Sequence, residues 1–363
     1  MLKLERIKIS SKYNAGKTKY SIADDNPKIW EILGENSPHQ GLVKAAYAEA
    51  SWKKINSALN AYKRYCECKR LTFKLPIDSV TMSNFVSWAA LEKKLSPDSI
   101  KSYISNIKLI HKLKGLPTDG CSSFLCKTLI RGAENLRFYS IEKKEQKKVM
   151  SLPLLRILGH ELANSNWSDH SKVVIWSTYT VAFMGSFRLG ELLAKSETEF
   201  NPLETLMWKD IKFMSDDSIQ IHVKVPKTRT AMGERISLFP FPFYGCCPVA
   251  AIKKLKSLAD MNGDLDKPVF MFDSGRLLTK ARLNKIIQIQ LFPHIGSEAR
   301  YYSCKSFRAA LPSALAANPH MTNDSTIKRW GRWNSKAFER YTRLSHSAKR
   351  KLFKKFIKAL SSD

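Results

Sequence analysis

Residues 330–343 read WGRWNSKAFERYTR, and they place one tyrosine, Tyr341, among cationic and aromatic side chains near the end of the sequence. A tyrosine is most often an amphipathic residue at the edge of a packed helix, and that interpretation is open here. The alternative is that Tyr341 is a nucleophile toward phosphate. That role requires an anion pocket, which other segments of the chain must supply.

The composition is that of a globular protein with a polyanionic partner. The 363 residues are enough for two domains, and 44% of them are hydrophobic. Lys and Arg number 61 against 32 Asp and Glu, a formal net charge of +29. Residues 1–150 hold 28 Lys and Arg against 14 Asp and Glu, so both halves are basic. We expect double-stranded DNA as the partner, held by two domains, because each neutralised phosphate releases counterions.

Two other classes of protein are disfavoured. No apolar run approaches the roughly 18 residues of a membrane span, and no signal-like segment opens the chain, so we expect an intracellular protein without membrane contact. The seven cysteines show no CxxC spacing and no matching histidine pair. We therefore expect reduced thiols, and neither a metal site nor a cofactor.

The hydrophobic pattern divides the chain into four parts. We expect an N-terminal arm at 1–40, an all-helical domain at 41–138, a lysine-rich linker at 139–152 and a larger domain at 153–363. The larger domain alternates helical patterns with three strand-like segments, 205–214, 218–225 and 234–241, and a short strand at 268–273. The fold class is therefore mainly α, with an α+β second domain that contains a small antiparallel sheet.

Local signals delimit the helices. The first begins near Gly41, Thr81 or Ser83 caps the second, and Ser96 and Gly115 bound the third. A later apolar helix is expected to end at Phe187. The basic side chains expected to face DNA from the helical domain are Lys53, Lys54, Lys63, Arg64 and Lys101.

Arg188 and Glu191 stand three residues apart in GSFRLGELLA, just after that apolar helix. An arginine at the start of a helix lies beside free N–H groups that favour anions. A surface ion pair is an equally good interpretation, because Arg131 and Glu134 in RGAE repeat the spacing.

Three further cations are candidates for a phosphate site. Lys227 lies at the tip between two strand-like segments in VKVPKTRT, and Arg229 beside it is expected to bind DNA. Lys305 and Arg308 are three residues apart in YSCKSFRAALPSALA and would share a helix face. A solvated hairpin lysine and a solvated basic face are the competing interpretations.

In this order, Arg188 with Glu191, LMWKDI, Lys227, CPVAAIKKL, PVFMF, Lys305 with Arg308, Trp333 and Tyr341 resemble the catalytic domain of the tyrosine recombinase, or phage integrase, family. The resemblance covers about residues 170–345, and residues 41–137 resemble the core-binding domain of that family more weakly. The ending GRWNSKAFERYTR looks most like the recombinases of eukaryotic mobile elements such as Cryptons.

The resemblance implies a role for each of these residues. Arg188 and Arg308 would clamp the scissile phosphate, Lys227 would protonate the leaving 5′ oxygen, and Tyr341 would form a 3′-phosphotyrosyl bond. Trp333 would orient the phosphate. Lys305 is a further catalytic residue that the resemblance implies, at a position where the family usually has a histidine, and Glu191 would support Arg188 as a structural partner.

The sequence departs from the family in its histidines. Ala309 follows Arg308, where the family often has a second histidine. Removal of the proton from Tyr341, whose ordinary pKa is about 10, then depends on the cationic pocket, on Lys305, or on a distant histidine such as His294 or His320.

The function expected from these features is site-specific DNA recombination or integration, by a homotetramer on specific duplex sites. The alternatives are a type IB topoisomerase or resolvase-like strand transferase, a DNA-binding regulator without turnover, and a general basic nucleic-acid binder. The basic C-terminal segment is expected to form a helix that docks on its own domain or on a neighbouring subunit. A eukaryotic host would place the protein in the nucleus.

Overall fold

The computed structural model describes residues 40–140, 148–226, 233–241, 245–259, 264–316 and 323–333. The chain divides into two compact units, residues 1–144 and 145–363. The expected arm at 1–40 lies outside the described residues except for Gln40, and so does the centre of the expected linker. The domain bounds stay a prediction.

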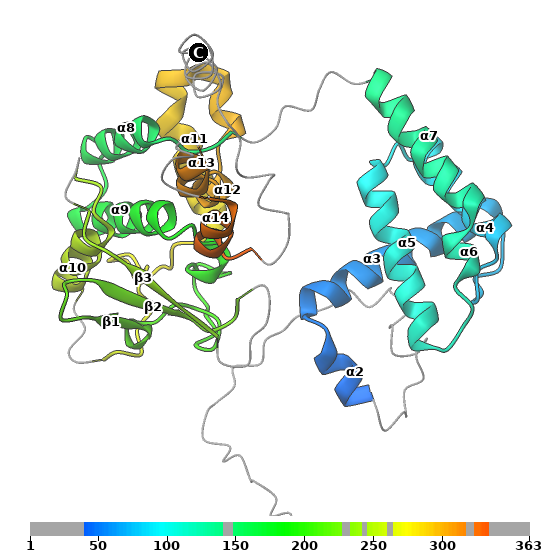
Figure 1. Ribbon diagram of the computed structural model, residues 1–363, viewed down its shortest axis with the longest axis horizontal. Coiled ribbons are helices and arrows are strands. Elements are labelled where there is room, and N and C mark those ends of the chain that lie inside the picture. Colours follow the sequence, from blue (N-terminus) through cyan, green and yellow to red (C-terminus); the bar gives the residue numbers. More distant parts are fainter. Residues whose placement is uncertain are drawn as a thin grey trace, which may run out of the picture. The chain divides into compact units, whose positions relative to one another are not determined.

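The first unit is helical throughout its described residues (Figure 1). Its elements are α2 (Gln40–Ala46), α3 (Glu49–Lys69), α4 (Ser79–Ser87) with a π turn (Trp88–Glu92), α5 (Pro97–Leu113), α6 (Asp119–Ser122) and α7 (Phe124–Ser140). Its core is aromatic: Tyr62 and Tyr65 both pack against Phe85, and Phe85 stacks on Trp88.

Side-chain caps begin two of these helices, α4 and α5. Ser96 accepts a hydrogen bond from the Ser99 N–H at 3.1 Å to begin α5, and Gly115 with φ of 66° follows its end, so both expected bounds are confirmed. The cap predicted for α4 was wrong. Asp78 accepts from the Thr81 N–H at 2.8 Å, because an Asp three residues earlier reaches the free amide that Thr81 itself exposes.

The second unit surrounds a central helix with further helices and a small sheet. Its helices are α8 (Leu152–Ala163), α9 (Asp169–Met184), α10 (Pro248–Leu258), α11 (Lys280–Ile295), α12 (Cys304–Arg308), α13 (Ala310–Ala316) and α14 (Asp324–Gly331). Figure 1 shows α9 between α8 and α10, and α9 is buried along most of its length. Residues from α9, α11 and the sheet share one core, with Tyr179, Leu291 and Ile221 among its fully buried members.

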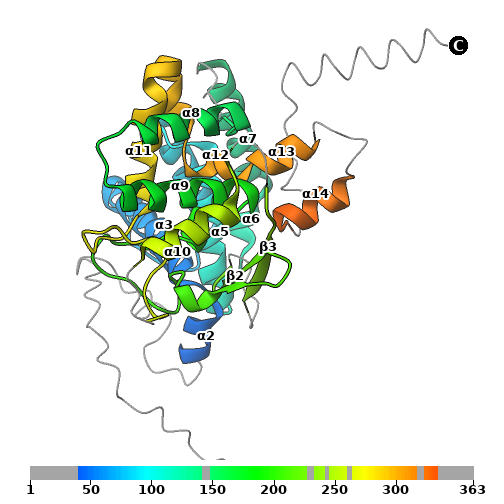
Figure 2. The same ribbon diagram turned by 90° about the vertical axis from the view of Figure 1, so that its left-hand side faces the viewer.

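The sheet has three antiparallel strands in the order β1 (Ile211–Phe213), β2 (Ile219–Val223) and β3 (Glu234–Leu238). The central register pairs Ile221 with Ile236. Figure 2 shows β3 at the sheet edge that faces α14. The expected fold class, mainly α with a small antiparallel sheet, is confirmed.

All four expected strands are shorter in the structure, and two of them lose most of their length. The segment 205–214 is a strand only at Ile211–Phe213, because the Asp210 carboxylate accepts from the Met207 N–H at 2.8 Å and closes a 3₁₀ turn there. The segment 268–273 contributes only isolated bridges, Pro268 to Met207 and Met271 to Leu277.

Among the described residues, no helix is long and apolar enough to cross a membrane. Within the same ranges, no three His, Cys, Asp or Glu side chains gather as metal ligands would. All seven cysteines lie in the described ranges and are free thiols.

Gly120 tests the packing of the helical unit. A Cβ at Gly120 would overlap with the Ile77 carbonyl oxygen, whereas a Cβ at Gly132, inside α7, would meet no atom within 4 Å. We expect Gly120→Ala to lower the free energy of unfolding by roughly 2–3 kcal/mol and Gly132→Ala to raise it by about 0.5–1 kcal/mol. Chemical denaturation of the full chain measures both. Equal stability of the two variants would contradict the described packing.

Candidate active site

A strained turn follows α9 and brings Arg188 into the second unit. α9 ends at Met184, three residues before the expected end at Phe187, because Ser186 has a left-handed φ of 48° and turns the chain. Ser186 is fully buried, so packing maintains a conformation that costs a non-glycine residue roughly 1 kcal/mol or more. A side chain at Gly185 would overlap with the ring of Phe187, so the tight turn requires glycine there.

Arg188 forms a local pair with Glu191, as the spacing predicted. The Arg188 N–H donates to Glu191 Oε2 at 3.0 Å, and Arg188 Nη1 donates to Oε1 at 2.9 Å. Glu191 is 7% exposed, so the pair is not a solvated surface pair. The same spacing in RGAE has a different outcome, because Glu134 pairs with Lys101 on α5.

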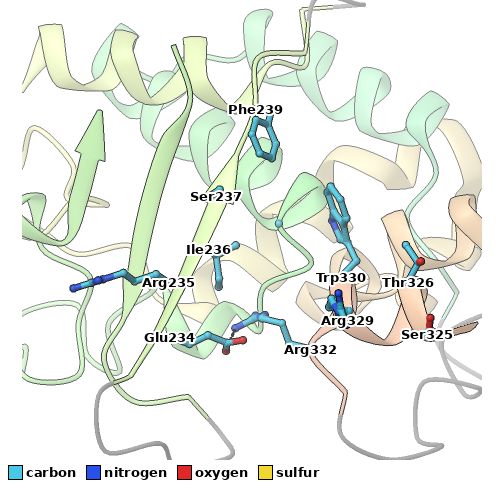
Figure 3. A pocket seen from close by; sticks show the side chains of 11 residues that line it. Glu234, Arg235, Ile236, Ser237, Phe239, Ser325, Thr326, Arg329, Trp330 and Arg332 are labelled. Carbon is cyan, nitrogen blue, oxygen red and sulfur yellow. Dashed lines mark hydrogen bonds and ion pairs between the residues drawn. The ribbon is translucent and has the colours of Figure 1, made fainter. Parts of the chain in front are cut away.

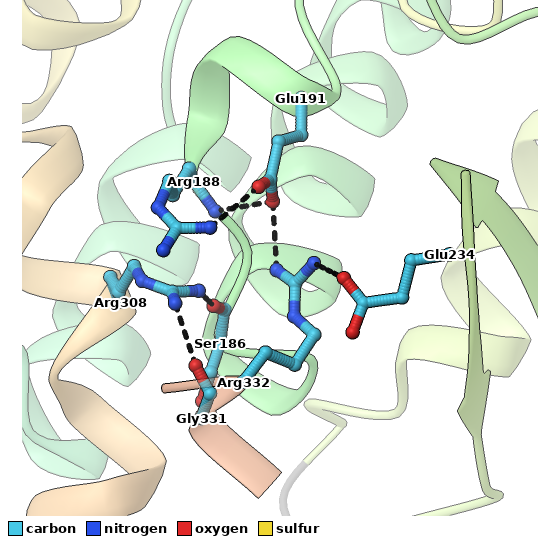
Figure 4. Close-up of polar contacts among 7 residues, drawn as sticks. All are labelled: Ser186, Arg188, Glu191, Glu234, Arg308, Gly331 and Arg332. Atoms are coloured by element: carbon cyan, nitrogen blue, oxygen red, sulfur yellow. Dashed lines mark hydrogen bonds and ion pairs between the residues drawn. The ribbon is translucent and has the colours of Figure 1, made fainter. Parts of the chain in front are cut away.

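Arg308 is the most deeply buried cation of the site. It ends α12, is 5% exposed, and lies with its guanidinium carbon 5.1 Å from the ring centroid of Trp333. Its Nη1 donates to the Ser186 carbonyl and its Nη2 to the Gly331 carbonyl, the latter at 2.6 Å (Figure 4). Carbonyl oxygens satisfy the donors without cancelling the positive charge, which suits an anion site.

Arg332 completes the cluster, and sequence reasoning missed it. Its Nη2 donates to Glu191 Oε2 at 2.7 Å and its Nη1 to Glu234 Oε2 at 3.0 Å. Figure 4 shows its guanidinium between these two carboxylates. No local pattern distinguishes Arg332 from its basic neighbours, because its partners lie 141 and 98 positions away in the chain.

The electrostatics of Glu191 follow from this arrangement. Burial is the largest single effect and would raise the pKa of its carboxyl group, but the charges and hydrogen bonds of Arg332 and Arg188 together outweigh it. The pKa of Glu191 is therefore below its ordinary value. The carboxylate stays charged at neutral pH and requires both arginines.

Lys305 and Arg308 do not share an environment, contrary to the expectation from their spacing. Lys305 is exposed, whereas Arg308 is covered by Gly331 and Trp333. The spacing rule misleads because α12 has only five residues and Arg308 stands at its end, where a distant segment packs over it. Burial also raises the pKa of the neighbouring Cys304 thiol to about 12, so this thiol is not a competing nucleophile.

Trp333 is buried, and Gly331 allows its ring to lie close to the backbone. A Cβ at Gly331 would overlap with the Trp333 ring. Glycine at this position therefore serves two contacts of Arg308, the carbonyl that accepts from it and the ring beneath its guanidinium.

Several expected residues lie outside the described ranges: Tyr341, Lys227, Arg229 and His320. Their roles remain predictions. His294 is described, and its Nε2 lies 2.9 Å from Glu161 Oε1. His294, one of the two distant histidines expected as a possible base for Tyr341, is therefore paired with Glu161 through this nitrogen.

The hairpin that leads to Lys227 contains a second lysine, Lys224, whose ammonium group is saturated. Its Nζ donates to the carbonyls of Pro202 and Thr205, each at 2.7 Å, and to Asp210 Oδ2 at 2.5 Å. An ammonium group has three N–H donors, and these three acceptors use all of them. Lys224 is therefore a structural residue and cannot easily donate a proton to a leaving group.

Tyr179, which packs on the residue that precedes Arg308, is also structural. Tyr179 stacks on Phe307, and its hydroxyl donates to Gln290 at 2.8 Å. Complete burial raises its pKa well above the ordinary value of 10. Tyr179 therefore does not compete with Tyr341 for the role of nucleophile.

A pocket of about 390 Å³ lies between β3 and α14 (Figure 3). Arg332 and Glu234 line one part of it, and Phe239 and Trp330 another. Neither Arg188 nor Arg308 lines this pocket, so the two guanidinium groups expected at a phosphate lie outside it.

The expected DNA-facing residues of the helical unit stand at its surface. Lys53 pairs with Glu49 at 2.9 Å, Lys63 lies 4.0 Å from Glu67, and Lys101 pairs with Glu134. Lys54 and Arg64 are also exposed. Solvated ion pairs of this kind are worth about 0–1 kcal/mol, so a phosphate can replace the carboxylate at little cost.

Comparison with known proteins gives the class of fold. No family model and no curated protein sequence matches the chain. Among solved structures, residues 82–397 of the Tn1549 transposon integrase in complex with circular intermediate DNA match 90% of this chain and 99% of that chain, with a TM-score of 0.57 and 12% identity. The XerH site-specific recombinase bound to difH substrate matches 91% of this chain and 88% of that chain, with a TM-score of 0.52 and 14% identity.

The chain therefore has the fold of the tyrosine recombinases, as its motifs predicted. The resemblance to Crypton recombinases stays a prediction, because neither structure comes from that group.

Glu191 gives the site a testable pH dependence. Its folded pKa lies below its ordinary value of 4.5, so its contribution to stability is present above about 4.5 and is lost as pH falls through the folded pKa. We expect Glu191→Gln to lower the free energy of unfolding by roughly 3 kcal/mol at pH 7. The difference in stability from the unsubstituted protein should shrink as pH falls below the ordinary pKa of 4.5, as measured by denaturation across pH.

The control is Glu197→Gln, since Glu197 also forms ion pairs with two arginines, Arg276 and Arg282, but its side chain is 38% exposed. It should change stability by less than about 1 kcal/mol. A Glu191→Gln effect that is the same at both ends of the pH range would show that the carboxylate charge is not what stabilises the cluster.

Proposed function

We propose that this chain is a site-specific DNA recombinase that cleaves and rejoins duplex DNA through a 3′-phosphotyrosyl intermediate on Tyr341. One observation carries the proposal: two arginines far apart in the sequence, Arg188 and Arg308, meet at one turn, where neutral carbonyls hold Arg308. The tyrosine recombinase fold supports it, and so do the similar structures, which are described as DNA complexes.

The chemistry assigns one role to each group. Tyr341 Oη attacks the scissile phosphorus, and the bond from phosphorus to the 5′ oxygen breaks. Arg188 and Arg308 donate to the non-bridging oxygens as charge develops on them, which is typically worth on the order of 10²–10³ in rate for one donor. Lys227 gives a proton to the departing 5′ oxygen. The phosphotyrosyl bond conserves the linkage, so a 5′ hydroxyl can reverse the step without an external energy source.

The proposal extends to the assembly and the base. Specific exchange requires two DNA sites and four active sites, so the active form would be a homotetramer on DNA. Lys305 is exposed, and its positive charge would lower the pKa of Tyr341 if the two side chains lie close together. Trp333 would orient the phosphate indirectly, through the Arg308 guanidinium that lies over its ring.

Covalent trapping tests the reaction class. A nicked duplex that carries the target site loses its cleaved fragment, so a covalent protein–DNA adduct accumulates. We expect the adduct to map to Tyr341 and Tyr341→Phe to abolish it, because no phenolic oxygen remains. Tyr301→Phe is the matched control, since Tyr301 also lies beside two cations, Arg300 and Lys148. Specific DNA binding without any adduct would favour a non-catalytic regulator.

Replacing the leaving group separates the two hairpin lysines. Lys227→Ala should slow cleavage of ordinary DNA by roughly 10²–10³. A substrate with sulfur in place of the bridging 5′ oxygen should restore the rate, because a thiolate leaves without a proton. Lys224→Met should instead lower stability, because the buried Asp210 carboxylate loses its cation. The role of Lys227 as acid would be wrong if the sulfur substrate gave no recovery.

A further inference from the structure

The cluster around Arg308 contains more buried charge than clamping a phosphate requires. It holds three guanidinium groups, of Arg188, Arg308 and Arg332, and two carboxylates, of Glu191 and Glu234 (Figure 4). Exposed fractions are 5% for Arg308, 8% for the Arg332 side chain and 7% for Glu191, whereas the side chains of Arg188 and Glu234 are 27% and 36% exposed. Charges in such an environment interact strongly, so the balance of the whole group determines which ion it can accept.

Arg332 is the cation that both carboxylates share. Glu191 Oε2 accepts from Arg332 Nη2 at 2.7 Å, and Glu234 Oε2 accepts from Nη1 at 3.0 Å. With Arg332, the five groups carry a formal charge of +1. Without Arg332, two guanidinium groups would face two carboxylates, and the formal charge would be zero.

The placement of Arg332 is built into the fold. It follows α14 with a left-handed φ of 55°, and its guanidinium carbon lies 5.2 Å from the ring centroid of Phe187. Such a backbone conformation costs a non-glycine residue roughly 1 kcal/mol or more, so the contacts of the side chain must offset that cost. A solvated arginine would need none of these features.

We propose that Arg332 is a positioning residue that neutralises Glu191 and Glu234, so that Arg188 and Arg308 keep a net positive charge for one phosphodiester. The substrate anion carries one negative charge, which matches the charge of +1 that the cluster retains. Arg332 also stands between Gly331 and Trp333, the two residues that contact Arg308 from this segment. The identity of the anion as a phosphodiester rests on the proposed function. The charge balance of the five groups does not depend on that function.

Three variants separate charge from geometry. Arg332→Met keeps an apolar stem against Phe187 and brings the cluster to zero. Arg332→Met with Glu234→Gln returns it to +1 without any arginine at 332. The triple variant that adds Glu191→Gln leaves Arg188 and Arg308 alone at +2. The matched control is Arg276→Met, which removes an equal charge from a residue that is 63% exposed and pairs with Glu197.

The affinity of the full chain for inorganic phosphate is measured by calorimetry. The part of the binding signal that Arg188→Met removes is the part that belongs to this site. We expect Arg332→Met to bind phosphate at least roughly tenfold more weakly than the unsubstituted protein. The double variant should recover to within about threefold, the triple variant should bind at least as tightly as the unsubstituted protein, and Arg276→Met should change nothing. The rate of adduct formation on nicked DNA should follow the same order.

Three outcomes would overturn the proposal. The first is unchanged phosphate affinity in Arg332→Met. The second is a double or triple variant that melts cooperatively yet does not recover, which would assign Arg332 a purely geometric role. The third is a phosphate signal that Arg188→Met leaves intact, because the cluster would then not be the anion site. If Arg332→Met does not fold, the triple variant decides, since no uncompensated carboxylate remains in it. If the phosphate affinities follow the expected order but no covalent adduct forms on DNA, the proposed recombinase function is wrong and the charge-balance proposal still holds.

Discussion

Burial of the Arg308 guanidinium is the constraint that organises the second unit. A buried guanidinium must have its donors satisfied, and here the acceptors are the carbonyls of Ser186 and Gly331, which lie 122 and 23 positions away. The end of α9, α12 and the end of α14 must therefore meet at one point. The strained φ of Ser186 and the need for glycine at 331 are local consequences of that meeting.

The same constraint explains why carboxylates lie beside the arginines of the proposed phosphate site. The turn that presents Arg188 needs a partner for its own N–H groups, and Glu191 provides it from within the buried turn. A buried carboxylate would attract the very cations that a phosphate needs. Arg332 resolves this conflict, because it occupies the second oxygen of Glu191 and leaves Arg188 with only one carboxylate contact among the described residues.

Sequence patterns predicted the features that depend on neighbouring residues. Ser96 caps α5 because its partner is three residues away, and the sheet follows from alternation within β2 and β3. Patterns failed where a distant segment decides the environment. RLGE and RGAE have the same spacing, yet tertiary contacts bury Glu191 and give Glu134 a different partner. Arg332 could not be found in this way, and neither could the difference in burial between Lys305 and Arg308.

The nature of the contacts also accounts for a shared fold at 12% identity. Most of the second unit is held by an apolar core, which accepts many combinations of side chains of suitable volume. The anchors of Arg308 are backbone carbonyls, which every residue type possesses, so they constrain conformation more than identity. Gly331, Arg308 and the saturated Lys224 are positions in the described residues where the contacts depend on the side chain itself. A fold defined by so few identities can persist after most of the sequence has changed, which is why short, widely separated motifs indicated it.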